Sequence, residues 1–365
     1  MPRDGGYRTA IPFVAHEAGE ISLIAQPTPH RHLAWLLTGL WDKRRRLRRL
    51  VPVLAELTRA GIADARESHR PESRIRQCYT GRQAPRSGNG LAIYAHYSEA
   101  GFVHEMILRQ LALYGDAGFD IVFVTMSDRV GEDDIRNLLP LTRLIIHRRS
   151  FGRDFGAWRD AADLAVNALG RPGELLLVND SVLGPLRPID RLIARMREHG
   201  PGLIGLTDSR MGPPHLQSYF LLVEGPAAVA EVLSFLEQLK LSHSEWLMVR
   251  RGEFGLTRCM AVHGHAVISM FPYDIVRAIA IDAGDGLPAQ YAPMNPTHNA
   301  WRVLIENLGF PFIKRDLLTC NPNAVGGVER WPSVLPNDSL IDAATIQSYL
   351  LEVSRKEKQK AKYDA

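Results

Sequence analysis

Two short polar clusters carry the side chains in this sequence that are best suited to bind a charged ligand. The first is a glycine turn made by Gly152, Arg153 and Asp154. The second is the pair Asn179 and Asp180, which directly follows a short apolar run. The 28 residues from Gly152 to Asp180 leave room for one helix and one strand, which would bring both clusters to the same edge of a sheet. We expect Arg153 to bind a phosphate and Asp154 a ribose or a base. The alternative, which we favour less, is a turn whose aspartate caps the next helix.

The tip formed by Asn179 and Asp180 suits a divalent cation. Carboxylate and amide oxygens are ligands of Mg²⁺ and Mn²⁺, and such a cation would neutralise a diphosphate leaving group. Asp180 is the metal ligand in this interpretation. The alternative is a turn at the end of a strand, which Gly184 and Pro185 fit equally well.

Glu253 is the candidate catalytic base. The segment from Glu253 to Gly264 has the pattern of a helix of about two turns that begins at the glutamate. A carboxylate placed in this way can deprotonate the hydroxyl of an acceptor. The alternative is a glutamate with no catalytic role, whose negative charge is stabilised by the positive end of the helix dipole.

Several histidines lie at predicted strand ends. His215 and Gln217 stand just before a predicted strand, where they could bind sugar or acceptor hydroxyls, and His96 ends the first strand, where a nucleotide base could stack. Each could instead be a half-buried polar side chain that the fold itself satisfies. His263 and His265 lack a third ligand at any zinc spacing, so we expect no zinc site there.

Apolar runs and amphipathic patterns alternate from Leu91 onward, which indicates strands that alternate with helices. Strands are expected at Leu91–Ala95, Phe119–Thr125, Arg143–His147, Leu175–Val178, Gly202–Thr207 and Tyr219–Val223. Helices are expected at Val103–Tyr114, Asp133–Leu139, Ala157–Leu169, Ile189–His199 and Pro226–Leu241. Connections of this kind are right-handed crossovers, so the sequence predicts an α/β fold with a mostly parallel central sheet flanked by helices.

The first 90 residues differ from the rest. Leucines recur there at helical spacing, and Lys43–Arg49 places six cations in seven positions. Pro52 should kink or restart this helix, and Glu67 to Gly90 is polar and reads as a linker. We therefore predict three parts: a helical basic segment with its linker over 1–90, an α/β domain over 91–320 and a helical tail over 321–365. The basic helix could lie on an anionic membrane or be a solvated face.

Composition limits the class of protein. The chain has 365 residues, a net charge of +4 and 45% hydrophobic residues, so it can bury a large core and does not require a nucleic-acid partner. Its three cysteines have no metal or redox spacing, which fits a reducing compartment. The apolar stretch His32–Trp41 is too short to span a bilayer, and the first residues lack the order of a signal peptide. We expect a cytoplasmic protein, at most peripheral to the inner face of the membrane.

Taken together and in order, these motifs resemble the rhamnan synthesis F family of bacterial polysaccharide glycosyltransferases, from Leu91 to about Leu318. The residues that carry the resemblance are Ala95-His-Tyr97, Phe119-Asp-Ile-Val-Phe-Val124, Gly152-Arg-Asp-Phe-Gly-Ala-Trp-Arg159, Leu177-Val-Asn-Asp-Ser-Val-Leu-Gly-Pro185, Gly205-Leu-Thr207, His215-Leu-Gln-Ser-Tyr-Phe220, Gly252-Glu253 and Gly255-Leu256. The segment Pro311–Leu317 also looks like one that is frequent in cell-surface polysaccharide transferases.

The resemblance implies a GT-A-like (Rossmann-like) fold and an inverting transfer of a sugar, often rhamnose, from a nucleotide-sugar donor to a polysaccharide or lipid-linked glycan. In that interpretation His96, Gly152, Arg153, Asp154, Asn179 and Asp180 bind the donor, His215 and Gln217 face the acceptor, and Glu253 is the base. A divalent cation, Mg²⁺ or Mn²⁺, would be the cofactor. The competing interpretation is a glycan- or nucleotide-binding module of polysaccharide assembly that does no catalysis, because the acidic tip has a single aspartate.

Overall fold

The computed structural model describes residues 43–70, 72–86, 88–284 and 294–363, and among these the side chains from 53 to 353. The strands are β1 (Ile75–Thr80), β2 (Gly90–His96), β3 (Phe119–Thr125), β4 (Leu144–Arg148), β5 (Glu174–Asn179), β6 (Val182–Leu183), β7 (Gly202–Ser209), β8 (His215–Leu216), β9 (Phe220–Glu224), β10 (Ala266–Phe271) and β11 (Ile313–Lys314).

The helices fill the connections between these strands and the C-terminal part of the chain. They are α2 (Lys43–Ser68), α3 (Glu105–Asp116), α4 (Glu132–Leu138), α5 (Arg153–Leu169), α6 (Asp190–Glu198), α7 (Pro226–Gln238), α8 (Glu245–Met248), α9 (Gly255–Val262), α10 (Tyr273–Asp282), α11 (Pro296–Asn299), α12 (Trp301–Glu306), α13 (Arg315–Thr319), α14 (Trp331–Val334) and α15 (Ala343–Tyr363). Two 3₁₀ turns, η2 (Leu139–Leu141) and η4 (Val328–Arg330), and one π-helical stretch, η3 (Val249–Phe254), complete them.

The central sheet has the strand order β1-β4-β3-β2-β5-β9-β7-β10, with β8 attached to β7. The prediction of an α/β fold with a central sheet is confirmed, but the prediction of a mostly parallel sheet is wrong. Strands β4, β3, β2 and β5 are parallel, whereas β9 runs antiparallel to both β5 and β7, and β1 runs antiparallel to β4. The ten residues 210–219 between β7 and β9 contain no helix and are too few for a parallel crossover, which needs a dozen or more.

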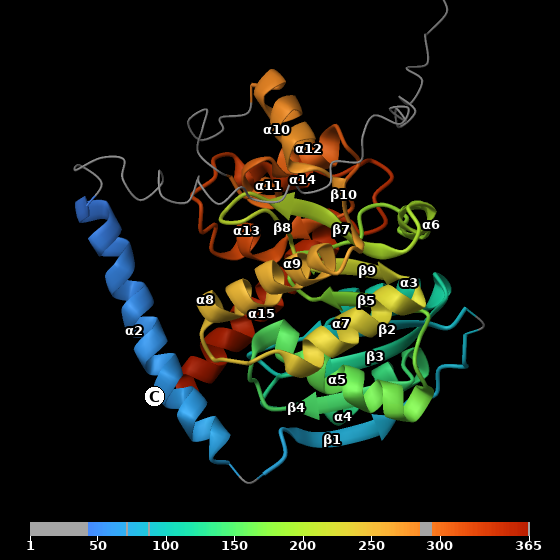
Figure 1. Cartoon of the computed structure of the whole chain (residues 1–365). Coiled ribbons are helices and arrows are strands. Elements are labelled where there is room, and N and C mark those ends of the chain that lie inside the picture. Colours follow the sequence, from blue (N-terminus) through green and yellow to red (C-terminus); the bar gives the residue numbers. More distant parts are fainter. Residues whose placement is uncertain (1–42, 71, 87, 285–293, 364–365) are drawn as a thin grey trace, which may run out of the picture.

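Two apolar clusters cover the two faces of the sheet. Successive residues of β2 alternate between them: Ala92 and Tyr94 belong to one cluster, and Leu91, Ile93 and Ala95 to the other. This alternation follows from the two-residue repeat of a strand. The first cluster is closed by α3, α6, α10 and α12, and the second by α5, α7 and α9. Figure 1 shows α5 and α7 side by side over one face of the sheet.

A third apolar cluster joins the C-terminal segment to the small sheet of β6 and β11. It includes Leu183, Leu317, Trp331 and Tyr349, the last of which lies on α15. The residues around β11 are thereby held against the chain that follows β5. This packing matters for the site, because β11 ends in a pair of cations.

The N-terminal part departs from the sequence prediction in two ways. The polar stretch predicted as a linker contains β1, which pairs with β4 and widens the sheet. The predicted restart of the helix at Pro52 is wrong, since α2 is helical without a break from Lys43 to Ser68, and the predicted kink there stays a prediction. Figure 1 shows α2 along one side of the molecule, near α8. There Glu56 accepts hydrogen bonds from the Ser244 hydroxyl at 2.8 Å and from the Trp246 N–H at 3.3 Å.

Within the described ranges, no helix combines the length and the apolar character that a membrane span requires. The apolar stretch His32–Trp41 and the tryptophans in it lie outside the described residues. Lys43–Arg49 lies in the first turns of α2, where the structure describes the backbone but not the side chains.

Candidate functional site

The candidate site begins where two neighbouring parallel strands end. β2 and β5 are paired so that Ala95 faces Asn179, which brings the residues that follow each strand side by side. The carboxylate Oδ2 of Asp180 accepts a hydrogen bond from the Tyr97 N–H at 3.2 Å. The same oxygen accepts a second one from Nη1 of Arg315 at 3.0 Å. Asp180 is buried, and the Arg315 guanidinium balances its negative charge inside the protein.

Asp154 lies in the first turn of α5 and joins this cluster through Asn179. The amide Nδ2 of Asn179 donates to Oδ2 of Asp154 at 2.8 Å, and its Oδ1 accepts from both the N–H and the hydroxyl of Ser181. Burial, followed by the charge of Asp180, raises the pKa of Asp154 to about 6. The structure thus brings together the aspartate of the glycine turn and the acidic tip, as expected from the chain order.

The other two residues of the glycine turn have different surroundings. Gly152 adopts a left-handed conformation with φ of 78°, and a Cβ there would approach Leu241 Cδ2 to 2.8 Å. Its glycine is therefore explained by the fold alone. The Arg153 guanidinium forms an ion pair with Glu245 at 2.9 Å, and both side chains are more than half exposed. Arg153 is thus paired with Glu245 and not with Asp154, although its charge is near enough to oppose the rise in the pKa of Asp154.

Two cations that the sequence analysis did not assign complete the cluster. β11 pairs with β6 so that Lys314 faces Val182, one residue beyond Ser181. The Lys314 ammonium donates to the Ser181 hydroxyl at 3.0 Å and lies 4.4 Å from the centre of the Tyr219 ring. Burial lowers the pKa of Lys314, and the nearby carboxylates of Asp316, Glu253 and Asp154 oppose that shift.

Arg315 is the second of these cations, and Asp180 raises its pKa. Its Nη1 also donates to the Tyr349 hydroxyl at 3.3 Å, so the C-terminal helix α15 contributes to the same cluster. The sequence held one signal for both residues, because Pro311–Leu317 sets two consecutive cations against an apolar run. That signal gave no partner, since Asp180 is 135 residues earlier in the chain.

Glu253 lies close to Lys314 but does not begin a helix, so the expected helix start is wrong. The helix begins at Glu245, capped by the Ser244 hydroxyl, and continues through η3 into α9. Glu253 lies within the π-helical stretch η3. π-Helical turns of this kind are frequent at functional sites because they redirect individual side chains. Glu253 is therefore not at the N-terminus of a helix, and the positive end of a helix dipole does not stabilise its carboxylate.

The Glu253 carboxylate is held from two sides. Its Oε1 accepts hydrogen bonds from the hydroxyl and the N–H of Ser218, and its Oε2 lies 3.6 Å from Nε2 of His215. The side chain is 22% exposed, so it can still be reached from outside. These contacts fix the carboxylate but leave lone pairs on Oε2 for an incoming hydroxyl.

The residues expected on the acceptor side are only partly brought to Glu253. His215 is buried, packs against Phe254 with 4.4 Å between ring centres and an angle of 52° between the rings, and lies 3.6 Å from the carboxylate. Gln217 instead accepts a hydrogen bond from the Thr207 hydroxyl at 2.7 Å and donates to Asn295 at 3.3 Å. Gln217 is therefore engaged by the fold on both ends of its amide.

His96 is part of the core at the end of β2. Its Nδ1 lies 3.0 Å from the Thr125 hydroxyl, and its ring centre lies 5.2 Å from that of Phe123. Burial lowers the pKa of His96 to about 4, so the ring is neutral at pH 7. The residue that follows it, Tyr97, has a ring that is 41% exposed. Tyr97 is thus the better placed of the two to stack on a base.

The surroundings of Asp180 do not favour a divalent cation. Arg315 and the Tyr97 N–H already use Oδ2 of Asp180, and the neighbouring carboxylate, Asp154, is bound to the Asn179 amide. Lys314 and Arg315 also place two positive charges beside Ser181 and Asp180, and these charges would repel a cation. The role of Asp180 as a metal ligand stays a prediction.

Comparison with known proteins adds a family. The sequence model described as rhamnan synthesis protein F matches residues 121–356. The chain is 29% identical over 194 residues to the uncharacterised protein y4gN of Sinorhizobium fredii, a match that covers 52% of this chain and 50% of that one. It is 28% identical over 211 residues to the virulence protein VirA of Vibrio anguillarum, over 49% of this chain and 63% of that one. The chain thus spans between half and two thirds of the length of these relatives. The family that it matches is described by a role in rhamnan synthesis.

Proposed function

The chain belongs to the rhamnan synthesis protein F family, and from this premise we propose that it is an inverting glycosyltransferase with a GT-A-like fold. It transfers a sugar, with rhamnose as the sugar that the family favours, from a nucleotide donor to a cell-surface polysaccharide or a lipid-linked glycan. The observation that carries the proposal is the pair Lys314 and Arg315, held at the strand ends beside Asp154 and Asp180 and close to the carboxylate of Glu253.

The donor diphosphate binds at the two cations in this proposal. A diphosphate needs positive charge most at the moment when it leaves, and fixed cations in a partly buried site supply that charge without rearrangement. Lys314 and Arg315 take the part that a metal ion plays in other transferases. In this proposal Asp154 and Asn179 face the nucleotide, and the base stacks on the exposed side chain of Tyr97.

Glu253 acts on the acceptor. Its Oε2 takes the proton of the acceptor hydroxyl as that oxygen bonds to the anomeric carbon of the donor sugar. The bond from this carbon to the diphosphate oxygen breaks, and its electron pair leaves with the diphosphate. Ser218 and His215 orient the carboxylate, and Lys314 and Arg315 neutralise the leaving group. A single displacement of this kind inverts the anomeric configuration.

The acceptor suggests where the enzyme works. A lipid-linked glycan presents its sugar at a membrane surface, and the cations of Lys43–Arg49 lie at the start of α2, on a part of the chain that extends beside the domain. We propose a cytoplasmic enzyme that touches the inner face of the membrane through this basic segment. Each cation near an anionic surface contributes about 1 kcal/mol.

Calorimetric titration of uridine, thymidine and guanosine diphosphates, with and without manganese, tests the donor site. The proposal predicts that at least one of them binds without metal, and that its sugar conjugate supports transfer to a glycan acceptor. Binding without any transfer or donor hydrolysis would favour the non-catalytic module instead. Failure of all three diphosphates to bind would contradict the proposal. Binding that requires manganese would instead favour a metal ion at Asp180 over the two cations alone.

A further inference from the structure

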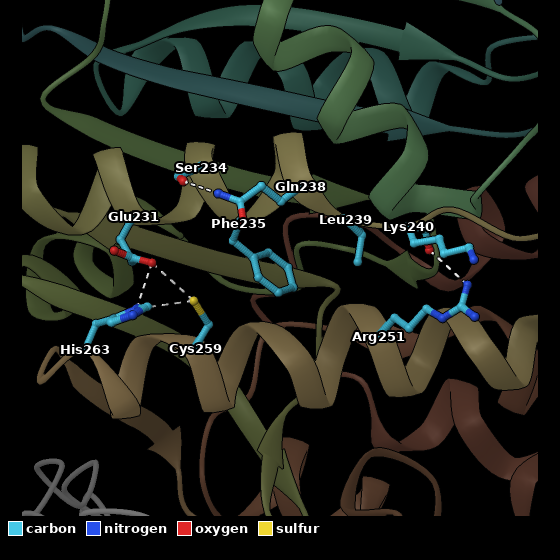
Figure 2. A pocket seen from close by; sticks show the side chains of 9 residues that line it. All are labelled: Glu231, Ser234, Phe235, Gln238, Leu239, Lys240, Arg251, Cys259 and His263. Atoms are coloured by element: carbon cyan, nitrogen blue, oxygen red, sulfur yellow. Dashed lines mark hydrogen bonds and ion pairs between the residues drawn. The ribbon is translucent and has the colours of Figure 1, made fainter.

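A second cluster of reactive side chains lies between α7 and α9 and shares no residue with the proposed transferase site. Glu231 comes from α7, Cys259 from α9, and His263 from the residue that directly follows α9. Figure 2 shows the three side chains converging across the gap between the two helices. The Glu231 Oε1 lies 2.8 Å from His263 Nδ1 and 3.2 Å from Cys259 Sγ, and Sγ lies 3.5 Å from Nδ1.

These three groups have the chemistry of a zinc site. Thiolate, imidazole and carboxylate are the usual protein ligands of Zn²⁺, with bonds of about 2.0–2.3 Å. Two such ligands on a tetrahedral ion lie about 3.3–3.6 Å apart. The separation of 3.5 Å between Cys259 and His263 already matches, and Glu231 needs only a small rotation to open its hydrogen bond to His263.

The cluster borders a surface cavity of about 720 Å³. The cavity continues along the same two helices past Phe235 to Arg251. An ion held by Glu231, Cys259 and His263 would therefore have its fourth position directed to solvent or to a ligand in this cavity. Three protein ligands with one open position are typical of zinc sites that bind a further molecule.

We propose that Glu231, Cys259 and His263 bind one Zn²⁺ ion, with its fourth coordination position open to the cavity. On binding, the Cys259 thiol releases its proton to solvent and its sulfur bonds to the ion. The His263 imidazole carries its hydrogen on Nε2 and presents the Nδ1 lone pair. The site is independent of the proposed transferase activity, although it would link α7 to the helix that continues from Glu253.

Zinc motifs are recognised in a sequence by ligands that lie close together in the chain, which is why no zinc site is expected from the spacing of His263 and His265 alone. Glu231 lies 28 residues before Cys259, beyond any spacing that a motif would reveal. The fold supplies this third ligand because α7 packs beside α9 over the same face of the sheet. His265 is not part of the cluster.

The experiment is a titration of chelator-treated, full-length protein with Zn²⁺, followed by calorimetry, and with Co²⁺, followed by the near-ultraviolet absorption of a cobalt–thiolate bond. We expect one Zn²⁺ per chain and a cobalt–thiolate band. C259S should abolish the band, and E231Q and H263A should each weaken Zn²⁺ at least about tenfold. The matched controls are C78S, C320S and H265A, which should bind as the wild type does.

Absence of stoichiometric Zn²⁺ binding in the wild type would overturn the proposal. So would a cobalt–thiolate band that survives C259S, or one that disappears in C78S or C320S. The circular dichroism of each metal-free variant is measured first. If C259S does not fold, E231Q and H263A decide the outcome through their Zn²⁺ affinities, and unchanged affinities in both would contradict the site.

Discussion

Two titratable side chains, Asp154 in the first turn of α5 and the buried His96 at the end of β2, should give the stability of this protein opposite dependences on pH. The pKa of Asp154 rises from 3.8 to about 6, and the pKa of His96 falls from 6.5 to about 4, both chiefly through burial. Between about pH 4 and pH 6 folded Asp154 holds a proton that the unfolded chain has lost, so its contribution to the free energy of unfolding declines as the pH rises. Across the same range the unfolded chain protonates His96 and the folded one does not, so the His96 contribution declines as the pH falls.

Substitution separates the two effects. Denaturant unfolding of D154N between pH 4 and pH 6.5 should show a free energy of unfolding that rises more steeply with pH than that of the wild type. H96Q should show the reverse, a flatter or falling curve. Curves for both variants that run parallel to the wild-type curve would contradict the assigned surroundings of Asp154 and His96.

Lys314 and Arg153 test which cation holds the donor. K314M keeps most of the buried volume of the side chain and removes its charge, and the dissociation constant of the nucleoside diphosphate should rise about 10- to 100-fold, the effect of losing a charged hydrogen bond of about 1.5–3 kcal/mol. Arg153 pairs with Glu245 at the surface, so R153A should change the free energy of unfolding by less than about 1 kcal/mol and affinity less than K314M does.

Calorimetry with the same diphosphate compares the two variants. If R153A loses more affinity than K314M does, Arg153 and not Lys314 is the main phosphate ligand, as the sequence of the glycine turn indicated. Arg315 is a poorer probe, because its removal would leave the buried Asp180 carboxylate without its partner and would cost stability as well as binding.

At the scale of elements, the sequence predicted most strands and helices because their apolar repeats are long enough to be recognised. It did not predict that β9 is antiparallel to its neighbours, because an apolar pattern along a strand does not show which way the strand runs in the sheet. It did not predict β6 and β11, because a strand of two residues is too short to show any apolar pattern. It also placed a helix start at Glu253, where local sequence cannot reveal that η3 continues a helix. The pairing of β6 with β11, two segments far apart in the chain, brings Lys314 to the ends of the central strands.

The π-helical stretch η3, which carries Glu253, is packed so tightly against α5 that a single added methyl group should displace it. A Cβ on Gly252 would lie 2.5 Å from the Phe155 ring, so G252A must push η3 away from α5. We expect a loss of about 1–3 kcal/mol in the free energy of unfolding, as for other overpacked sites, together with a fall in turnover as Glu253 moves. The control is G61A in α2, where a Cβ has open space, so turnover should be retained and the free energy of unfolding should stay the same or rise by up to about 1 kcal/mol. Full activity in G252A would show that the position of η3 does not matter.

At the scale of the whole molecule, the strand ends, α5, η3 and the C-terminal segment converge on one site, and the basic start of α2 stands apart from it. Sequence order predicted the meeting of Asp154 with Asp180 because a single helix and strand separate them. It could not predict that Tyr349 of α15 reaches Arg315, since the packing of the third apolar cluster decides that contact. The 321–365 segment therefore contributes to the site, although its standing as a separate part stays a prediction.

Membrane contact through Lys43–Arg49 is a prediction for the whole chain. Co-sedimentation should be strong with vesicles that contain anionic lipid, should weaken as salt rises, and should decline when the six cations are replaced by glutamine. Neutralising the exposed Arg109 and Arg136 in the body of the domain is the matched control and should have little effect. Equal pelleting with neutral and anionic vesicles would contradict an electrostatic contact.

The most direct test of the central claim is the turnover of E253Q with a donor that the wild type uses. Glutamine keeps the shape of the side chain and can still accept from Ser218, but it cannot take the proton of the acceptor. Turnover should fall about 100- to 10,000-fold, while the dissociation constant of the donor stays within severalfold of the wild-type value. E245Q, in the exposed pair with Arg153, is the control and should keep its turnover. An E253Q enzyme with turnover within severalfold of the wild type would contradict the claim that Glu253 is the base.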